Sequence, residues 1–155
     1  MEKHQFTATE LVALFGQGCS VADLAGVDKK HLEALYALAY QLYQSKNFDD
    51  AASIFRALCL YDYNEIKYFM GLGGCEQALG NYKKAADIYS LASVVSGLVD
   101  PEPMYYAAVC LLKAGEKENA VAALESLSIM GKEGDAKDDT FKNKGAALLK
   151  IVSEK

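Results

Sequence analysis

The stretch FMGLGGCEQALGNYKKAADIY, residues 69–89, decides the fold because two helical patterns meet in it across a turn. Leu72-Gly73 belongs to its first half, and Ala85-x-x-x-Tyr89 belongs to its second half. Gly80-Asn81 lies between the two, and both residue types tolerate the left-handed backbone that ends a helix. Small residues let two helices approach closely, and large residues fill the space beside them. The stretch therefore predicts a pair of packed helices.

The same pattern recurs on both sides of this stretch. Leu38-Ala39 precedes Leu72-Gly73 by 34 residues, and Ala107-Ala108 follows it by 35 residues. A repeat of about this length, with small and large residues at fixed places, is typical of tetratricopeptide repeats. The sequence predicts three such repeats, over residues 32–65, 66–99 and 100–133.

The predicted fold is all-α, with three tetratricopeptide helix pairs in a right-handed superhelix and additional N-terminal and C-terminal helices. All of residues 1–155 are expected to form a single domain, in which residues 1–30 are an N-terminal helical segment. A C-terminal helix over 138–153 is expected to cover the apolar face that an end repeat leaves exposed. The repeat helices are predicted near residues 29–45, 48–61, 65–79, 82–96, 101–114 and 117–130.

Composition excludes several classes of function. The net charge of −5 argues against nucleic-acid binding, which needs clustered basic residues. No apolar run reaches the roughly eighteen residues that span a bilayer, so membrane insertion is not expected. The chain begins without the basic and apolar stretches of an export signal, and its cysteines form no C-x-x-C pair. We expect a protein of a reducing cytoplasm with structural cysteines.

Catalysis, a bound metal and a cofactor are not expected either. The two histidines, His4 and His31, lie far apart and beside no recognisable nucleophile motif. The glycines between Gly71 and Gly74 fall within a helical pattern, whereas a phosphate-binding glycine motif needs a loop. The sequence thus favours a binding protein over an enzyme.

The first helix of each repeat is expected to line the concave side of the superhelix. In the first repeat this face carries Tyr36, Tyr40 and Tyr43, whose spacings of four and three place the rings along one stripe. Tyrosine offers contact area and a hydroxyl at a low cost in side-chain entropy. We predict that the stripe binds an extended apolar segment; the alternative is that it belongs to a core or an oligomer contact. The predicted groove residues are Tyr36, Tyr40, Tyr43, Lys67, Met70, Gly74, Gln77, Tyr105 and Val109.

Three stretches indicate which class of tetratricopeptide-repeat protein this is: LYALAYQLYQS at 35–45, FRALCLYD at 55–62 and MGLGGC at 70–75. Together with GQGCSVADL at 16–24, they resemble the class II chaperones of bacterial type III secretion systems. The FRxLCxYD segment is not demanded by the general repeat consensus, so the resemblance is specific.

This resemblance implies a cytoplasmic bacterial protein that binds two hydrophobic translocator proteins before secretion and keeps them soluble, without a nucleotide. In such chaperones the concave groove takes a short extended segment with a proline and spaced apolar anchors, and Tyr36, Tyr40 and Tyr43 fall at the groove positions. Members often form homodimers through their N-terminal region, which suggests Leu11, Leu14 and Phe15 either as a dimer contact or as a cap on the first repeat. Some relatives also assist a transcription activator.

The alternative function is a tetratricopeptide scaffold that joins soluble proteins in an assembly. A scaffold that grips a carboxylate-ended peptide would line its groove with Lys, Arg and Asn. The predicted groove offers mainly Tyr, Met and aliphatic groups, with Lys67 as the principal basic exception.

Overall fold

The computed structural model describes residues 7, 9–10, 13, 17 and 20–154. Within these residues every regular element is a helix, which confirms the all-α prediction. The helices pair in sequence, α3 with α4, α5 with α6 and α7 with α8, as three helix pairs require. Their bounds are α2 (Val21–Ala25), α3 (Lys29–Gln44), α4 (Phe48–Tyr61), α5 (Ile66–Ala78), α6 (Tyr82–Val95), α7 (Pro101–Lys113), α8 (Lys117–Leu127) and α9 (Ala136–Ser153).

Local chemistry sets where the helices begin. The carboxylates of Asp28, Asp100 and Asp135 each accept a hydrogen bond from a backbone N–H in the first turn of α3, α7 and α9, respectively. Pro101 follows Asp100 at the first position of α7, where a missing N–H costs nothing.

The turns inside the three helix pairs share one backbone geometry. Gly80, which the sequence places in a turn, and Gly115 have left-handed backbone, with φ of 80° and 81°. In the first pair, Lys46 takes the left-handed position with φ of 65°, and Asn47 has φ of −88°. The three positions are equivalent in the repeat, so the turn geometry is conserved between repeats even where a lysine replaces glycine.

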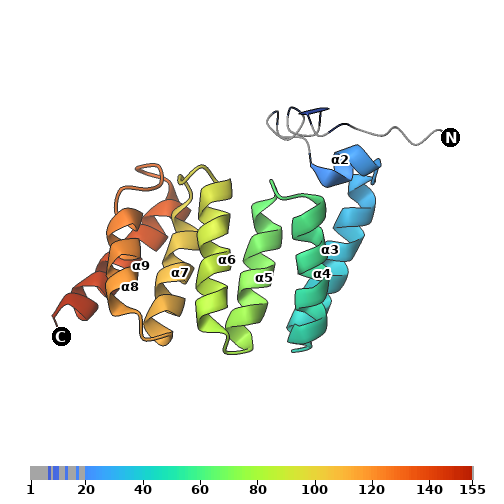
Figure 1. Cartoon of the computed structure of the whole chain (residues 1–155). Helices are drawn as coiled ribbons and strands as arrows, with labels where there is room; N and C mark the ends of the chain where they lie inside the picture. Colours follow the sequence, from blue (N-terminus) through green and yellow to red (C-terminus); the bar gives the residue numbers. More distant parts are fainter. Residues whose placement is uncertain (1–6, 8, 11–12, 14–16, 18–19, 155) are drawn as a thin grey trace.

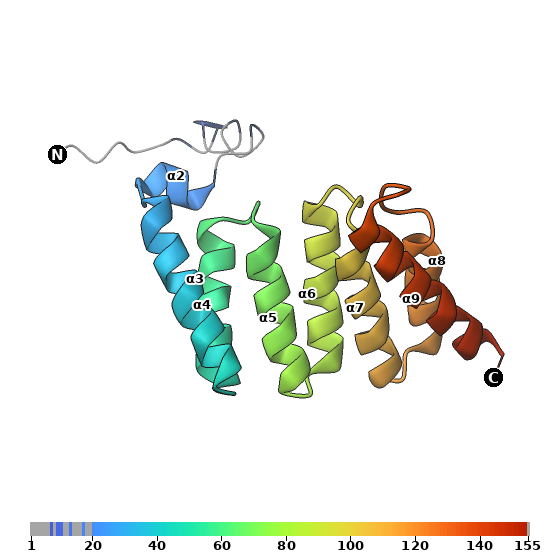
Figure 2. The same cartoon turned by 180° about the vertical axis from the view of Figure 1, so that it is seen from behind.

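Helices α3 to α8 stand side by side and alternate in direction, each packing on the next, as Figures 1 and 2 show. At one end the short helix α2 contacts α4, and at the other end α9 packs on α7 and α8. The core runs through the stack in three clusters, centred on Phe55 and Leu58, on Ala85 and Tyr89, and on Leu124 and Leu127. Because each pair buries its apolar residues against the next pair, the first helices α3, α5 and α7 share one face.

A buried carboxylate lies where most repeats carry an aromatic residue. Glu76 on α5 is only 2% exposed. It accepts a hydrogen bond from Asn81 Nδ2 at 2.9 Å, and it pairs with Lys84 Nζ at 3.4 Å and Arg56 Nη2 at 3.5 Å. These partners satisfy the charge at the α5–α6 turn, which explains how the repeat tolerates the exchange.

Glycine permits the closest helix approaches. A Cβ at Gly73 would lie 2.7 Å from the ring of Tyr89, and one at Gly71 would overlap the ring of Phe55. At the C-terminal end, Gly145 of α9 lies so close to Leu127 that a Cβ there would also overlap. The large residues of one helix therefore occupy the space that the small residues of its neighbour leave free.

Two adjacent glycines give a test of this packing. Gly73→Ala is expected to lower the free energy of unfolding by about 1–3 kcal/mol, because the buried Tyr89 ring has no room to move away. Gly74→Ala is its matched control: the new Cβ would meet Tyr43 at 3.5 Å, an ordinary contact, and should raise stability by about 0.5–1 kcal/mol through helix propensity. Urea unfolding followed by circular dichroism measures both, and equal effects of the same sign would contradict the packing argument.

Candidate binding groove

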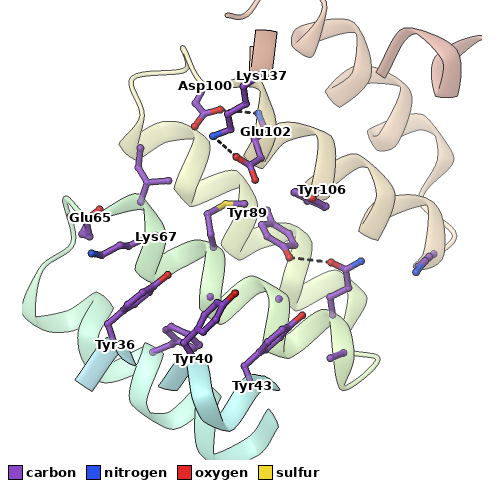
Figure 3. Close-up of a pocket in the computed structure, with 18 residues that line it drawn as sticks. Tyr36, Tyr40, Tyr43, Glu65, Lys67, Tyr89, Asp100, Glu102, Tyr106 and Lys137 are labelled. Atoms are coloured by element: carbon purple, nitrogen blue, oxygen red, sulfur yellow. Dashed lines mark hydrogen bonds and ion pairs between the residues drawn. The ribbon is translucent and has the colours of Figure 1, made fainter. Parts of the chain in front are cut away.

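A pocket of about 1010 Å³ opens on the face shared by α3, α5 and α7. This is the upper end of the usual size of a ligand site. It brings together most of the predicted groove residues, namely Tyr36, Tyr40, Tyr43, Lys67, Met70, Gly74 and Gln77. The close-up in Figure 3 shows the tyrosines of α3 along one side and Tyr106 on the opposite side. We call this pocket the groove.

One wall of the groove is the tyrosine ladder, formed by Tyr36, Tyr40 and Tyr43 (Figure 3). The Tyr36 and Tyr40 rings are stacked with their centroids 6.3 Å apart. Tyr36 also packs edge-on against Phe55 at 5.9 Å, so it serves the core as well as the groove. Tyr40 is 48% exposed, which makes it the rung with the most surface for a ligand.

The floor of the groove consists of Met70, Gly74, Gln77 and Tyr89. Gly74 carries no side chain, and the Tyr43 ring lies 3.5 Å from where its Cβ would be. The Tyr89 hydroxyl donates a hydrogen bond to Gln77 Oε1 at 3.0 Å (Figure 3). Burial raises the pKa of Tyr89 well above its usual value, so the hydroxyl keeps its proton at neutral pH and remains a donor. Tyr89 escaped the sequence analysis because the repeat pattern gives it a packing role.

The opposite wall of the groove is lined in the third repeat by other residues than the predicted ones. Tyr106, with Glu102 and Lys113, lines the groove, whereas Tyr105 and Val109 do not line it. Phe141 of α9 packs against both neighbouring rings, 5.7 Å from Tyr105 and 5.8 Å from Tyr106. A shift of one residue turns a side chain by about 100° around a helix. The spacing of Glu102, Tyr106 and Lys113, at four and seven residues, is the sequence signal that identifies this stripe.

Charged side chains at the rim of the groove are arranged in pairs. Lys67 Nζ lies 2.7 Å from Glu33 Oε1 and 4.7 Å from the centre of the Tyr36 ring. Lys137, contributed by α9, lies 2.6 Å from Glu102 Oε2 (Figure 3). The hydrogen bond to its glutamate raises the pKa of each lysine. Lys137 was missed by the sequence analysis because nothing in its local sequence relates α9 to the groove.

Reactive groups are not gathered in the described part of the chain. Residues 7, 9–10, 13, 17 and 20–154 contain no cluster of His, Cys, Asp and Glu that could hold a metal. Burial raises the pKa of the Cys59 thiol to about 12 and those of Cys75 and Cys110 to about 11, which disfavours their reactive thiolates. A search of the same residues finds no helix with the length and apolarity to cross a membrane. Leu11, Leu14 and Phe15, the predicted dimer contacts, lie outside the described residues, as does Cys19.

Known proteins resemble this chain in their repeats, in their sequences and in their solved structures. Tetratricopeptide-repeat family models match residues 32–64 and 104–128. Low calcium response locus protein H of Yersinia pestis is 38% identical over 107 residues, covering 69% of this chain and 63% of that protein. The matched region therefore spans less than two thirds of this relative.

Two solved structures are similar over most of their length. The Yersinia enterocolitica type III secretion translocator chaperone SycD is 32% identical, with a TM-score of 0.75, covering 86% of this chain and 98% of SycD. The Pseudomonas aeruginosa protein PcrH, solved in complex with the chaperone-binding region of PopD, is also 32% identical, with a TM-score of 0.73. That match covers 83% of this chain and 96% of PcrH.

Proposed function

Because the chain belongs to the family of type III secretion translocator chaperones, we propose that it binds hydrophobic translocator proteins and keeps them soluble and competent for secretion. The groove would hold an extended segment of the translocator. PcrH is solved with the chaperone-binding region of PopD, and SycD is solved with a peptide of the translocator YopD. The bacterial cytoplasm is the proposed place of action.

The tyrosine ladder is the observation that carries this proposal. Its central ring, Tyr40, is 48% exposed beside a pocket of about 1010 Å³. A half-exposed aromatic ring at the edge of a large concave pocket gains contact area when an apolar segment covers it. The proposed role is therefore capture through apolar contact, with no covalent chemistry.

The lysines that line the groove already have partners within the protein. This favours a translocator segment as the ligand over the carboxylate-ended peptide that a scaffold would bind. Lys67 and Lys137 are paired with Glu33 and Glu102. Lys113, which also lines the groove, lies 5.3 Å from the centre of the Tyr82 ring. A ligand carboxylate would have to compete with these contacts, whereas an apolar segment leaves them in place.

Co-expression with hydrophobic translocators from the same genome tests the proposal. We expect each translocator to stay in the soluble fraction and to co-purify with the chaperone, because its apolar segments no longer associate with one another. Each translocator expressed alone is the control and should sediment. Sedimentation in the presence of the chaperone would contradict the proposal and favour the scaffold function.

A further inference from the structure

The Gln77 amide in the groove floor has one end bonded and one end free. Its Oε1 accepts the hydrogen bond from Tyr89 at 3.0 Å, while its Nε2 has no hydrogen-bond partner among the described residues. Tyr89 is 4% exposed, so its hydroxyl hydrogen must find a partner inside the protein. Donation to Oε1 satisfies that hydrogen, and it leaves both N–H groups of Gln77 available to a ligand.

Packing holds this pair in place. The Tyr89 ring lies against Gly73 on one side and stacks on Tyr106, with the ring centroids 5.5 Å apart. The ring therefore fixes the direction of its hydroxyl, and the hydroxyl fixes the Gln77 amide. Figure 3 shows the bond at the end of the groove next to Tyr43.

The floor of the groove beside Gln77 carries no side chain at Gly74. Gly74 precedes Gln77 by one helical turn, so both lie on the same face of α5. A Cβ at Gly74 would meet the Tyr43 ring at 3.5 Å, an ordinary contact, so the ring of Tyr43 packs over the glycine one turn before Gln77.

We infer that Gln77 donates a hydrogen bond to a main-chain carbonyl of the bound segment, and that Tyr89 is the positioning residue for this bond. The inference rests on the proposed function of the groove. An extended segment offers unpaired carbonyls, whereas a helix uses its carbonyls internally. Gln77 thus selects extended over helical segments and does so without regard to side-chain sequence, while the tyrosine ladder selects apolar anchors.

The test uses short overlapping peptides that cover the two translocators of the chain's own secretion system. The labelled peptide that wild-type protein binds most tightly, measured by fluorescence anisotropy, is the probe. Gln77→Met keeps the length of the side chain and loses the donor, so Kd should rise about fivefold. Gln77→Glu places an acceptor against the carbonyl and should raise Kd by more than Gln77→Met does. Gln41→Met, on the exposed face of α3 and outside the groove, is the control and should leave Kd unchanged.

A double-mutant cycle tests the positioning role of Tyr89. Tyr89→Phe removes only the hydroxyl and should weaken binding about as much as Gln77→Met, because the freed amide rotates. In the double variant the two increases in Kd should not multiply, since both result from the loss of the same hydrogen bond between Gln77 and the ligand. A further test replaces the peptide bonds of the probe by ester bonds, one at a time, because an ester carbonyl is a weaker hydrogen-bond acceptor than an amide carbonyl. The wild type should lose affinity at the one position whose carbonyl Gln77 binds. The Gln77→Met variant should show no loss at that position.

Three outcomes separate the hypotheses. The role of Gln77 would be overturned if the increases in Kd of the two single variants multiply in the double variant, or if the ester effect persists in Gln77→Met. Either result would leave the groove function intact. Equal affinity of wild type and Gln77→Glu would overturn it as well. If the wild type binds none of the peptides, the proposed function itself fails, and the inference fails with it.

Discussion

Replacing Tyr40 by alanine is expected to weaken binding of the translocator segment by about 2 kcal/mol, or about thirtyfold in Kd. The substitution removes the most exposed rung of the tyrosine ladder, while Ala39 and Ala51, which pack the helices together, stay unchanged. Isothermal calorimetry with the tightest-binding translocator peptide gives Kd, and circular dichroism verifies that helicity is retained.

Tyr61→Ala is the matched control for the Tyr40 variant. Tyr61 ends α4, is 39% exposed and does not line the groove, so the same change in residue type should leave Kd within about twofold of the wild type. If both variants weaken binding equally, or if a folded Tyr40→Ala protein binds like the wild type, the ladder is a packing or self-association surface.

Phe55→Ala is expected to be the most destabilising single change considered, lowering the free energy of unfolding by about 3–5 kcal/mol. Phe55 is 1% exposed, meets Tyr36 edge-on at 5.9 Å and fills the space above Gly71. Its loss would leave a cavity between α3, α4 and α5 that these helices cannot close without disturbing the ladder. The midpoint of thermal unfolding should fall by about 10 °C.

Leu60→Ala on the same helix serves as the comparison. Leu60 is 70% exposed, so its truncation should change the free energy of unfolding by less than about 0.5 kcal/mol. Urea unfolding of both variants by circular dichroism supplies the values. A Phe55→Ala loss below about 1 kcal/mol would mean that the site collapses around the smaller side chain and that Phe55 is not central to the first core cluster.

Most of the fold was predictable because each signal for it is local. The recurrence of Leu38-Ala39 as Leu72-Gly73 and Ala107-Ala108 gave the repeats, and the confirmed family assignment followed from stretches inside them and from one stretch just before them. Helix starts at Asp28 and Asp100 depend on a side chain bonding its own following turn. The tyrosine ladder was equally predictable from the sequence, since residues three and four apart on one helix share a face wherever the helix is packed.

Contacts between distant segments decided the rest of the groove. Tyr106 lines the groove and Tyr105 does not, because the rotation of α7 in the stack turns one of these neighbouring side chains toward the pocket and the other away from it. The docking of α9 carries Lys137 to Glu102, 35 residues away in the sequence, and the packing of α6 on α5 brings the Tyr89 hydroxyl to Gln77. The sequence alone determined the repeats, the helices and the ladder, because the periodicity of a helix is an intrinsic property of its own residues. Only the tertiary structure determined the opposite wall and the polar bond in the floor, because these depend on how one helix is rotated and seated against another.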